Sequence, residues 1–252
     1  MSFDLAAEAY DRFMGRYSTP LSAPMAEFAA VRKGDLVLDV GCGPGALTAE
    51  LASRLGPAAV TAVDPSARFA AAARARNPEV NVIEASAEAL PFAHAMFDAA
   101  LAQLVVQFMA DPVAGLAEMA RVTRPDGVVA ASVWDYGGHQ SPLDPFWRAA
   151  RELDPGVNDE SELAGARGGQ LATLFEAAGL RQIEGTVLSV SLAHPSFESW
   201  WEPFTGGVGP AGAYLASLDP DRQVELRERC RARLPKAPFT LMARAWAARS
   251  VV

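Results

Sequence analysis

The most informative stretch of the sequence is Val37-Leu38-Asp39-Val40-Gly41-Cys42-Gly43-Pro44-Gly45, in which an apolar run is followed directly by closely spaced glycines. A short apolar run before such a turn is typical of a buried parallel strand, and residues 46–55 carry leucines at the spacing of a following helix. Glycines let bare backbone amides approach a ligand at the carboxyl edge of the sheet. The stretch therefore predicts both the fold and the position of a ligand site.

An acidic residue, Asp64, ends the next apolar run, 23 positions after Gly41. A carboxylate there can accept both hydrogen bonds from a ribose diol, so the pair predicts a nucleoside-containing cofactor. Residues 41–46 also satisfy the dinucleotide pattern G-x-G-x-x-A, and the turn alone does not decide between cofactors. Gly45 and Asp39 favour S-adenosylmethionine, since a cofactor without a pyrophosphate needs no glycine at the following helical position.

Short apolar runs alternate with amphipathic stretches along most of the chain, which is the pattern of βαβ units around a parallel sheet. Strands are expected at 36–40, 60–63, 81–84, 97–101, 128–134, 187–192 and 239–247, and helices at 46–55, 66–76, 113–123 and 171–178. The pattern predicts an α/β fold with a doubly wound, mostly parallel, seven-stranded sheet. A chain of 252 residues, half of them apolar, suits one such domain.

Two segments, 136–165 and 194–237, interrupt this rhythm, and we expect both to be insertions that cap the carboxyl edge of the sheet. Their large apolar side chains are Phe146, Trp147, Phe197, Trp200, Trp201 and Phe204. Two interpretations remain open for these aromatic residues: they line an acceptor pocket, or they pack helices onto the core.

The composition indicates which kinds of binding partner and which cellular compartment to expect. A net charge of −8 disfavours a nucleic-acid substrate, because the phosphate backbone would be repelled. Two cysteines, Cys42 and Cys230, suggest no disulfide framework, and the N-terminus lacks the charged and apolar regions of a signal peptide. The apolar run 99–110 is interrupted by Gln103 and Gln107, so no membrane span is expected. We expect a cytoplasmic protein whose oligomeric state the sequence leaves open.

Four segments resemble class I S-adenosylmethionine-dependent methyltransferases of the Methyltransf_11 type, the group that includes ubiquinone and menaquinone biosynthesis methyltransferases. The segments are 37–45, 63–66, 87–92, and 97–98 followed by 121–127. The resemblance implies one methyltransferase domain over residues 1–252, with a Rossmann-like sheet and S-adenosylmethionine as cofactor. It says little about the acceptor.

The resemblance also implies roles for the residues of the glycine-rich turn. Gly41, Gly43 and Gly45 would face the methionine part of the cofactor and the nearby sugar. Asp39 would be oriented towards the cofactor through hydrogen bonds or water. Asp64 would hold the ribose hydroxyls.

Further along the chain, the resemblance places four more residues at the cofactor. Pro65 would lie beside the adenine, and Ala87 would offer its backbone amide to an adenine nitrogen. Ser86 stands where relatives often have an aspartate, and a serine accepts the same hydrogen bond more weakly. Gln103 matches a position near the methionine moiety.

The N-terminal segment 1–33 resembles a helical cover that lies over the cofactor in relatives. Arg16 could then meet the methionine carboxylate, and Tyr17 could line the acceptor site. The alternative is a helix that only packs its apolar side chains, Phe13 and Met14 among them, on the core.

Methyl transfer from a sulfonium is a direct displacement, which needs a general base only when the acceptor is a weak acid or a protonated amine. His139 follows the fifth strand at the ligand edge and is the catalytic candidate, with a surface-loop position as the alternative. The three histidines, His94, His139 and His194, are far apart and lack metal-binding spacing, so no metal is expected.

The sequence thus predicts transfer of a methyl group from S-adenosylmethionine to a small, partly hydrophobic acceptor. One alternative is a protein that binds the cofactor without catalysing transfer. The other is an NAD-dependent oxidoreductase, which would call for a hydride-transfer constellation such as Tyr-x-x-x-Lys, and no tyrosine of this chain has a lysine at that spacing.

Overall fold

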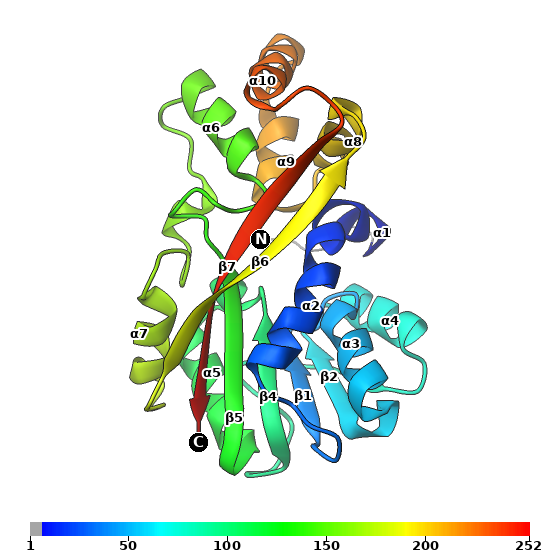
Figure 1. The fold of residues 1–252 in the computed structure, drawn as a ribbon, viewed down its shortest axis with the longest axis vertical. Coiled ribbons are helices and arrows are strands. Elements are labelled where there is room, and N and C mark those ends of the chain that lie inside the picture. The colour runs from blue at the N-terminus through cyan, green and yellow to red at the C-terminus, as the bar shows by residue number, and fades with distance from the viewer. Residues whose placement is uncertain (1–6) are drawn as a thin grey trace.

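The computed structural model describes residues 7–252, which form a seven-stranded sheet with helices on both faces (Figure 1). The strands are β1 (Val37–Val40), β2 (Val60–Asp64), β3 (Asn81–Glu84), β4 (Phe97–Gln103), β5 (Thr123–Trp134), β6 (Glu184–His194) and β7 (Phe239–Val251). Their order is β3-β2-β1-β4-β5-β7-β6, with β1 to β5 parallel and β7 antiparallel to both of its neighbours. The predicted doubly wound, mostly parallel sheet is confirmed.

Helices cover both faces of the sheet because its central strands are apolar on both sides. One face carries α2 (Arg16–Phe28), α3 (Ala46–Leu55) and α4 (Ala67–Arg76), and the other carries α5 (Pro112–Val122) and α7 (Gln170–Ala177). All four residues of β1 are buried. A short helix, α1 (Ala7–Tyr10), leads through a π-helical turn at Asp11–Gly15 into α2.

Four further helices form a cap beyond the carboxyl ends of the parallel strands (Figure 1). They are α6 (Asp144–Leu153), α8 (Phe197–Trp201), α9 (Gly209–Ser217) and α10 (Pro220–Arg233). The long strands β6 and β7 pair with each other from Glu184 and Arg249 to His194 and Phe239, and so reach from the sheet into the cap. The cap therefore coincides with the two segments that interrupt the βαβ rhythm.

The fifth strand begins earlier than the sequence predicts. A turn is expected at 124–127, but Thr123 already pairs with Phe97, and the register then shifts before Ala99 pairs with Val128. Asp126 has a φ of 65°, so the turn residues form an irregularity within β5. The local sequence predicts the turn at 124–127. It does not predict the pairing of Thr123, because the partner, Phe97, is far away in the sequence.

In the part of the chain that the structure describes, no helix combines the length and apolar character needed to cross a bilayer.

Candidate active site

A cavity of about 330 Å³ lies at the carboxyl ends of β1, β2, β3 and β4, and we call it the main cavity. A segment at the end of each strand lines it: 41–44 after β1, 64–66 from the last residue of β2, 86–88 after β3, and 103–105 from the last residue of β4. Tyr10 and Asp11 from the N-terminal segment and 108–110 also line it. The site is therefore at the edge where parallel α/β sheets hold their ligands.

The turn after β1 needs glycine at its first position. Gly41 has a φ of 69°, and a Cβ placed there would lie 2.3 Å from Val105 Cγ2. The backbone N–H groups of Gly41 and Cys42 both donate to the carbonyl of Val63, at 2.8 and 2.9 Å. Gly43 has a φ of 54° with open space around a hypothetical Cβ, and both glycines line the main cavity.

The third glycine of the turn has a packing role. Gly45 has a φ of 89°, and a Cβ there would lie 2.6 Å from Asn77 Nδ2 and 3.3 Å from Ala73 Cα. It thus allows the start of α3 to approach α4 closely. The predicted contact between Gly45 and a cofactor stays a prediction, because the wall of the main cavity is formed by its neighbours in the turn.

Two buried carboxylates line the main cavity on either side of the turn. Asp39 Oδ2 accepts from Thr48 Oγ1 at 2.6 Å, whereas Oδ1 has no hydrogen-bond partner among the described residues, and burial raises the pKa of Asp39 to about 7. Asp64 accepts from the backbone N–H groups of Gly43 at 2.8 Å and Ser66 at 2.9 Å, and burial raises its pKa. Asp64 therefore also fixes the shape of the turn.

The segment after β3 brings in a carboxylate that the sequence reasoning missed. Ser86 and Ala87 line the main cavity, with Glu88 beside them, and their predicted contacts with adenine stay predictions. Glu88 accepts from the Ser86 hydroxyl and from the backbone N–H groups of Ala110 at 2.8 Å and Asp111 at 3.3 Å. An acid thus stands next to the position where relatives often have an aspartate. Its place two residues after Ser86 was the signal that could have found it.

Pro65 and Gln103 also line the main cavity. Gln103 Nε2 donates to the carbonyl of Ser18 at 3.0 Å and contacts Ser22 Oγ at 3.2 Å, which ties β4 to α2. Its Oε1 is buried and has no hydrogen-bond partner among residues 7–252. This oxygen remains available to accept a hydrogen bond from a ligand.

The structure places Arg16 and Tyr17 at the junction between α2 and the cap. Arg16 Nη1 donates to the carbonyl of Ser199 at 2.8 Å, and Nη2 lies 3.4 Å from His194 Nδ1. Tyr17 is buried, with its hydroxyl 3.0 Å from His194 Nε2. These contacts hold the N-terminal cover to β6, and the predicted contact of Arg16 with a methionine carboxylate stays a prediction. Residues 1–6 of the expected cover, 1–33, lie outside the described residues.

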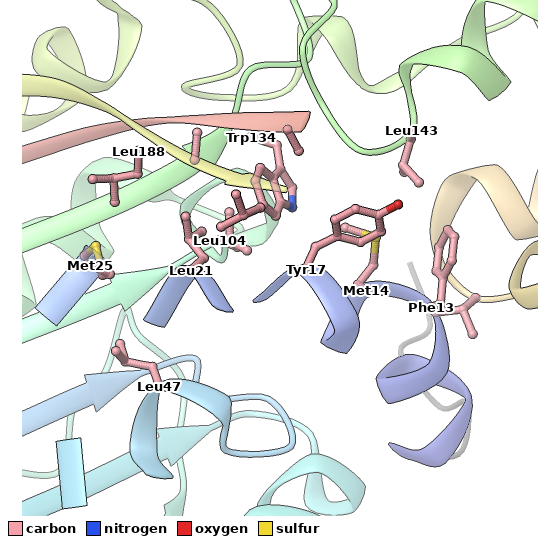
Figure 2. Packing of buried hydrophobic residues seen from close by; sticks show 14 of the residues in the cluster. Phe13, Met14, Tyr17, Leu21, Met25, Leu47, Leu104, Trp134, Leu143 and Leu188 are labelled. Carbon is pink, nitrogen blue, oxygen red and sulfur yellow. The ribbon is translucent and has the colours of Figure 1, made fainter. Parts of the chain in front are cut away.

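A second, smaller cavity of about 30 Å³ adjoins the main cavity, and we call it the side chamber. Tyr10, Leu104 and Phe108 line both spaces. The side chamber is further lined by Phe13, Met14, Gln107, Trp134, Tyr136, Leu143, Glu160 and 208–210. Figure 2 shows Trp134, Leu104, Tyr17, Met14 and Leu143 around this part of the core. Both insertions thus contribute to its wall.

His139 lies outside both spaces. Its side chain is 43% exposed, and Nδ1 lies 3.3 Å from Asp144 Oδ1 and 3.3 Å from Arg151 Nη2. It lines a third cavity of about 10 Å³, which shares Tyr136 and Glu160 with the side chamber. The prediction that His139 is a general base stays untested, but the structure does not bring it to the main cavity or the side chamber.

The aromatic residues of the two insertions pack mainly against one another. The rings of Phe146 and Phe204 are stacked with centroids 4.7 Å apart, and Trp200 lies 4.9 Å from Phe204. Phe146 and Trp201, from different insertions, are 6.3 Å apart. Of the two interpretations that the sequence left open, packing describes these residues, while other residues of the same segments line the side chamber.

The structure reveals one buried ionisable group, Glu160, within a stretch that the sequence indicates only as part of an acidic loop. Glu160 is only 3% exposed, and its Oε2 accepts from Trp147 Nε1 at 2.8 Å. Burial raises the pKa of Glu160 to about 7, even though hydrogen bonds from Trp147 and Tyr136 oppose that shift. Nothing in the local sequence distinguishes Glu160 from its acidic neighbours, because its burial depends on α6.

Comparisons with known proteins agree with this geometry. Residues 38–131 match the family described as "Methyltransferase domain". A malonyl-acyl-carrier-protein O-methyltransferase from Erwinia billingiae is 34% identical over 149 residues, which cover 57% of this chain and 58% of that protein. This chain therefore spans less than two thirds of that relative's length.

Two further comparisons extend beyond the matched domain. An uncharacterized methyltransferase from Mycobacterium marinum is 30% identical over 203 residues, covering 75% of this chain and 79% of that protein. The YcgJ protein from Bacillus subtilis shares the fold with a TM-score of 0.60 at 19% identity, over 92% of this chain and 97% of that one. With the glycine-rich turn, Asp64 and the sheet order in place, the chain belongs to the family of S-adenosylmethionine-dependent methyltransferases.

Proposed function

We propose that this protein transfers the methyl group of S-adenosylmethionine to a small, partly apolar acceptor by direct displacement. One observation carries the proposal: an acidic main cavity at the sheet edge adjoins a side chamber whose wall is mostly apolar. The two spaces share Tyr10, Leu104 and Phe108, so a cofactor in one can meet an acceptor in the other.

The charge of the main cavity suits this cofactor. Asp11, Asp39, Asp64 and Glu88 line it, and no lysine or arginine does so among the described residues. A negative cavity attracts the sulfonium and ammonium groups of S-adenosylmethionine and repels the pyrophosphate of a dinucleotide. The charge distribution therefore supports S-adenosylmethionine over NAD.

The unpartnered acceptors also fit the cofactor. Asp39 Oδ1 and Gln103 Oε1 are buried without a partner in the described chain, and both side chains line the main cavity. A buried acceptor without a donor is costly, and a ligand with N–H or O–H groups removes that cost. Asp64 retains capacity for the ribose hydroxyls, since a carboxylate can accept more hydrogen bonds than the two it receives here.

When bound, S-adenosylmethionine supplies an electrophilic methyl group. The chain's own contribution is to orient the reactants and exclude water, which can provide ~7–11 kcal/mol of the barrier reduction. The cap supports this role, because its helices lie beyond the carboxyl ends of the parallel strands and residues of its two segments line the side chamber. We assign acceptor choice to segments 136–165 and 194–237, which provide Tyr136, Leu143 and 208–210 to the side chamber.

Calorimetry with S-adenosylmethionine, S-adenosylhomocysteine and NAD tests the cofactor. We expect the first two to bind at micromolar to millimolar concentrations and NAD to bind far more weakly. Turnover of S-adenosylmethionine with a panel of small acceptors then tests catalysis. Preferential binding of NAD would contradict the proposal, and cofactor binding without transfer to any acceptor would favour a non-catalytic S-adenosylmethionine-binding protein.

A further inference from the structure

The side chamber carries polar atoms that nothing in the protein satisfies. Trp134 Nε1 and Gln107 Oε1 are both buried and lack a hydrogen-bond partner among residues 7–252. Gln107 Nε2 donates to the carbonyl of Leu104 at 2.9 Å, which leaves Oε1 as the free acceptor. In Figure 2 the indole nitrogen of Trp134 is on the side of the ring that faces Tyr17 and Leu143. Trp134 and Gln107, which carry this donor and this acceptor, both line the side chamber.

A carboxylate completes the polar part of this wall. Glu160 lines the side chamber and is held by Trp147 Nε1 at 2.8 Å and by a hydrogen bond from Tyr136. Trp134, Gln107 and Glu160 are 1%, 6% and 3% exposed, so all three are shielded from bulk water. Buried polar groups without partners are rare in proteins, and a set of them around one space points to a ligand.

We infer that Trp134, Gln107 and Glu160 form a subsite for the hydroxyl group of the methyl acceptor, with Glu160 as the general base that takes its proton. The inference rests on the proposed function. A hydroxyl both accepts and donates, so it can receive the N–H of Trp134 while it donates to Glu160 or Gln107. The chamber, at about 30 Å³, has room for such a group, and the rest of the acceptor extends past Leu104 and Phe108.

Other acceptor groups fit this wall less well. A carboxylate would meet the oxygen atoms of Glu160 and Gln107, both of which are acceptors when Glu160 is ionised. A ketone or ester accepts but cannot donate, and would leave Gln107 Oε1 unpaired. An ammonium donates but cannot accept, and would leave the Trp134 N–H unpaired. A hydroxyl pairs with the Trp134 N–H and with one of the two acceptors, so it is the one group of these four that serves both the donor and an acceptor of the wall.

The chemical step balances in atoms and charge. The acceptor oxygen forms a bond to the methyl carbon while the bond between that carbon and sulfur breaks, and the sulfur keeps the electron pair. The hydroxyl proton moves to the carboxylate of Glu160, and from there to solvent. The sulfonium loses its positive charge, the acceptor becomes a neutral methyl ether, and the products are that ether, S-adenosylhomocysteine and one proton.

The surroundings of Glu160 suit a base that works near neutral pH. The ionisable groups around it are Tyr10, Tyr136, His139, Asp144, Arg151 and Asp159. Asp159 forms an ion pair with Arg151, so the charge next to Glu160 is largely balanced. Burial is the main cause that raises its pKa to about 7, and Glu160 is therefore ionised in a growing fraction of molecules as the pH rises through 7.

The test uses three probes that share a benzene ring: phenol, acetophenone and benzoate. Each is titrated by calorimetry into protein saturated with S-adenosylhomocysteine, which carries no methyl group to transfer. We expect phenol to bind at least tenfold more tightly than the other two at pH 8. Its affinity should fall as the pH drops below 7, because protonated Glu160 loses its charge as an acceptor, whereas benzoate should bind better at low pH.

Two variants and a matched control assign these effects. Glu160→Gln keeps an acceptor for Trp147 Nε1 and should abolish the pH dependence of phenol binding, while Trp134→Phe should weaken phenol binding about three- to tenfold. Glu162→Gln changes an exposed acid in the same loop and should change neither. All variants should bind S-adenosylhomocysteine like the parent protein.

The possible failures are distinguishable. If S-adenosylhomocysteine does not bind, the proposed function is wrong. If it binds, but phenol fails to bind, or acetophenone or benzoate binds more tightly at pH 8, the hydroxyl subsite is wrong. An unchanged pH dependence in a folded Glu160→Gln variant would likewise overturn the assignment of the base.

Discussion

The main cavity and the side chamber share part of their walls but are built in different ways. The main cavity is formed by short segments that each follow a strand, and its key contacts join neighbouring elements, such as Thr48 to Asp39 and Asp64 to Gly43. The side chamber is formed by single residues from distant parts of the chain, such as Phe13, Trp134 and Val208. Strand geometry therefore dictates the first, and tertiary packing dictates the second.

This difference suits two separate tasks, which are to hold a cofactor and to choose an acceptor. A turn that is fixed by glycine conformation and backbone hydrogen bonds can hold the same cofactor in many relatives. A chamber whose shape depends on the packing of a cap can change with a few substitutions while the sheet stays as it is. Four predictions test whether the two regions are as separable as this contrast implies.

The largest effect is expected for Phe146→Ala in the cap. Phe146 is fully buried, stacks on Phe204 at 4.7 Å and contacts Trp147 edge to face at 5.2 Å. Removing a buried ring of this kind costs ~3–5 kcal/mol in the free energy of unfolding, measured by urea denaturation. Val224→Ala, at a side chain on α10 that is 63% exposed, should change it by less than about 0.5 kcal/mol.

This result also decides how the cap relates to the sheet. We expect Phe146→Ala to unfold in one transition with affinity for S-adenosylhomocysteine nearly unchanged, because its ring does not line the main cavity. Two separate transitions would mean that the cap unfolds by itself. A loss of cofactor affinity in the folded variant would show that cap and cofactor cavity are coupled.

The second prediction concerns Asp64→Ala in the cofactor region. The substitution removes the expected ribose acceptor, and S-adenosylhomocysteine should bind more weakly by about 1.5–3 kcal/mol in calorimetry. Stability should also fall, because the N–H groups of Gly43 and Ser66 lose their acceptor. Glu84→Ala is the matched control, since Glu84 pairs with Asp64 across the sheet but is exposed. Equal affinity in both variants would mean that another residue holds the ribose.

Much of the lining of the main cavity could be predicted from sequence, because its geometry is local, while the contacts of these residues with a cofactor stay predictions. The order of strands and glycines places Gly41, Asp64 and Ser86 at one edge without knowledge of any distant contact. Gly45 shows the limit of this reasoning. A glycine pattern indicates close approach, but only the structure shows that the neighbours are Ala73 on α4 and Asn77 directly after it.

The sequence indicates where the cap lies in the chain, but it does not predict the cap's helices or their packing. The broken βαβ rhythm indicated segments 136–165 and 194–237, yet their three C-terminal helices and the burial of Glu160 depend on contacts between residues far apart in the chain. Trp147 and Glu160 are 13 positions apart in a stretch without regular spacing. For the same reason the sequence places His139 at the ligand edge of the sheet, whereas in the structure its side chain lines neither the main cavity nor the side chamber.

The third prediction uses the two carboxylates whose pKa values burial raises to about 7, Asp39 in the main cavity and Glu160 in the side chamber. Between the ordinary pKa of each acid and 7, the folded state binds a proton that the unfolded state has released. The free energy of unfolding should therefore fall as the pH rises from about 4 to 7, by an amount on the order of 1–3 kcal/mol per group.

Urea unfolding of the ligand-free protein at a series of pH values measures this loss. Asp39→Asn and Glu160→Gln should each flatten part of the slope, and both keep an oxygen that accepts the hydrogen bond from Thr48 or Trp147. Additive effects would show that the two regions titrate independently. A slope that neither variant changes would contradict the assignment of raised pKa values to these groups.

The smallest effect is expected for His139→Ala. The two candidate bases, Glu160 and His139, lead to opposite expectations for this variant. With Glu160 as base, the variant should keep kcat within about threefold of the parent value and keep its pH profile, because the His139 side chain is 43% exposed and contacts Asp144 and Arg151, neither of which lines the main cavity or the side chamber. With His139 as base, the rate should fall by roughly 10²–10⁴-fold. Transfer to the best acceptor found in the panel is the measurement, and Arg148→Ala, which removes another exposed contact of Asp144, is the control. A large loss in His139→Ala alone would identify His139 as the proton-accepting group and contradict the assignment of Glu160 as the base.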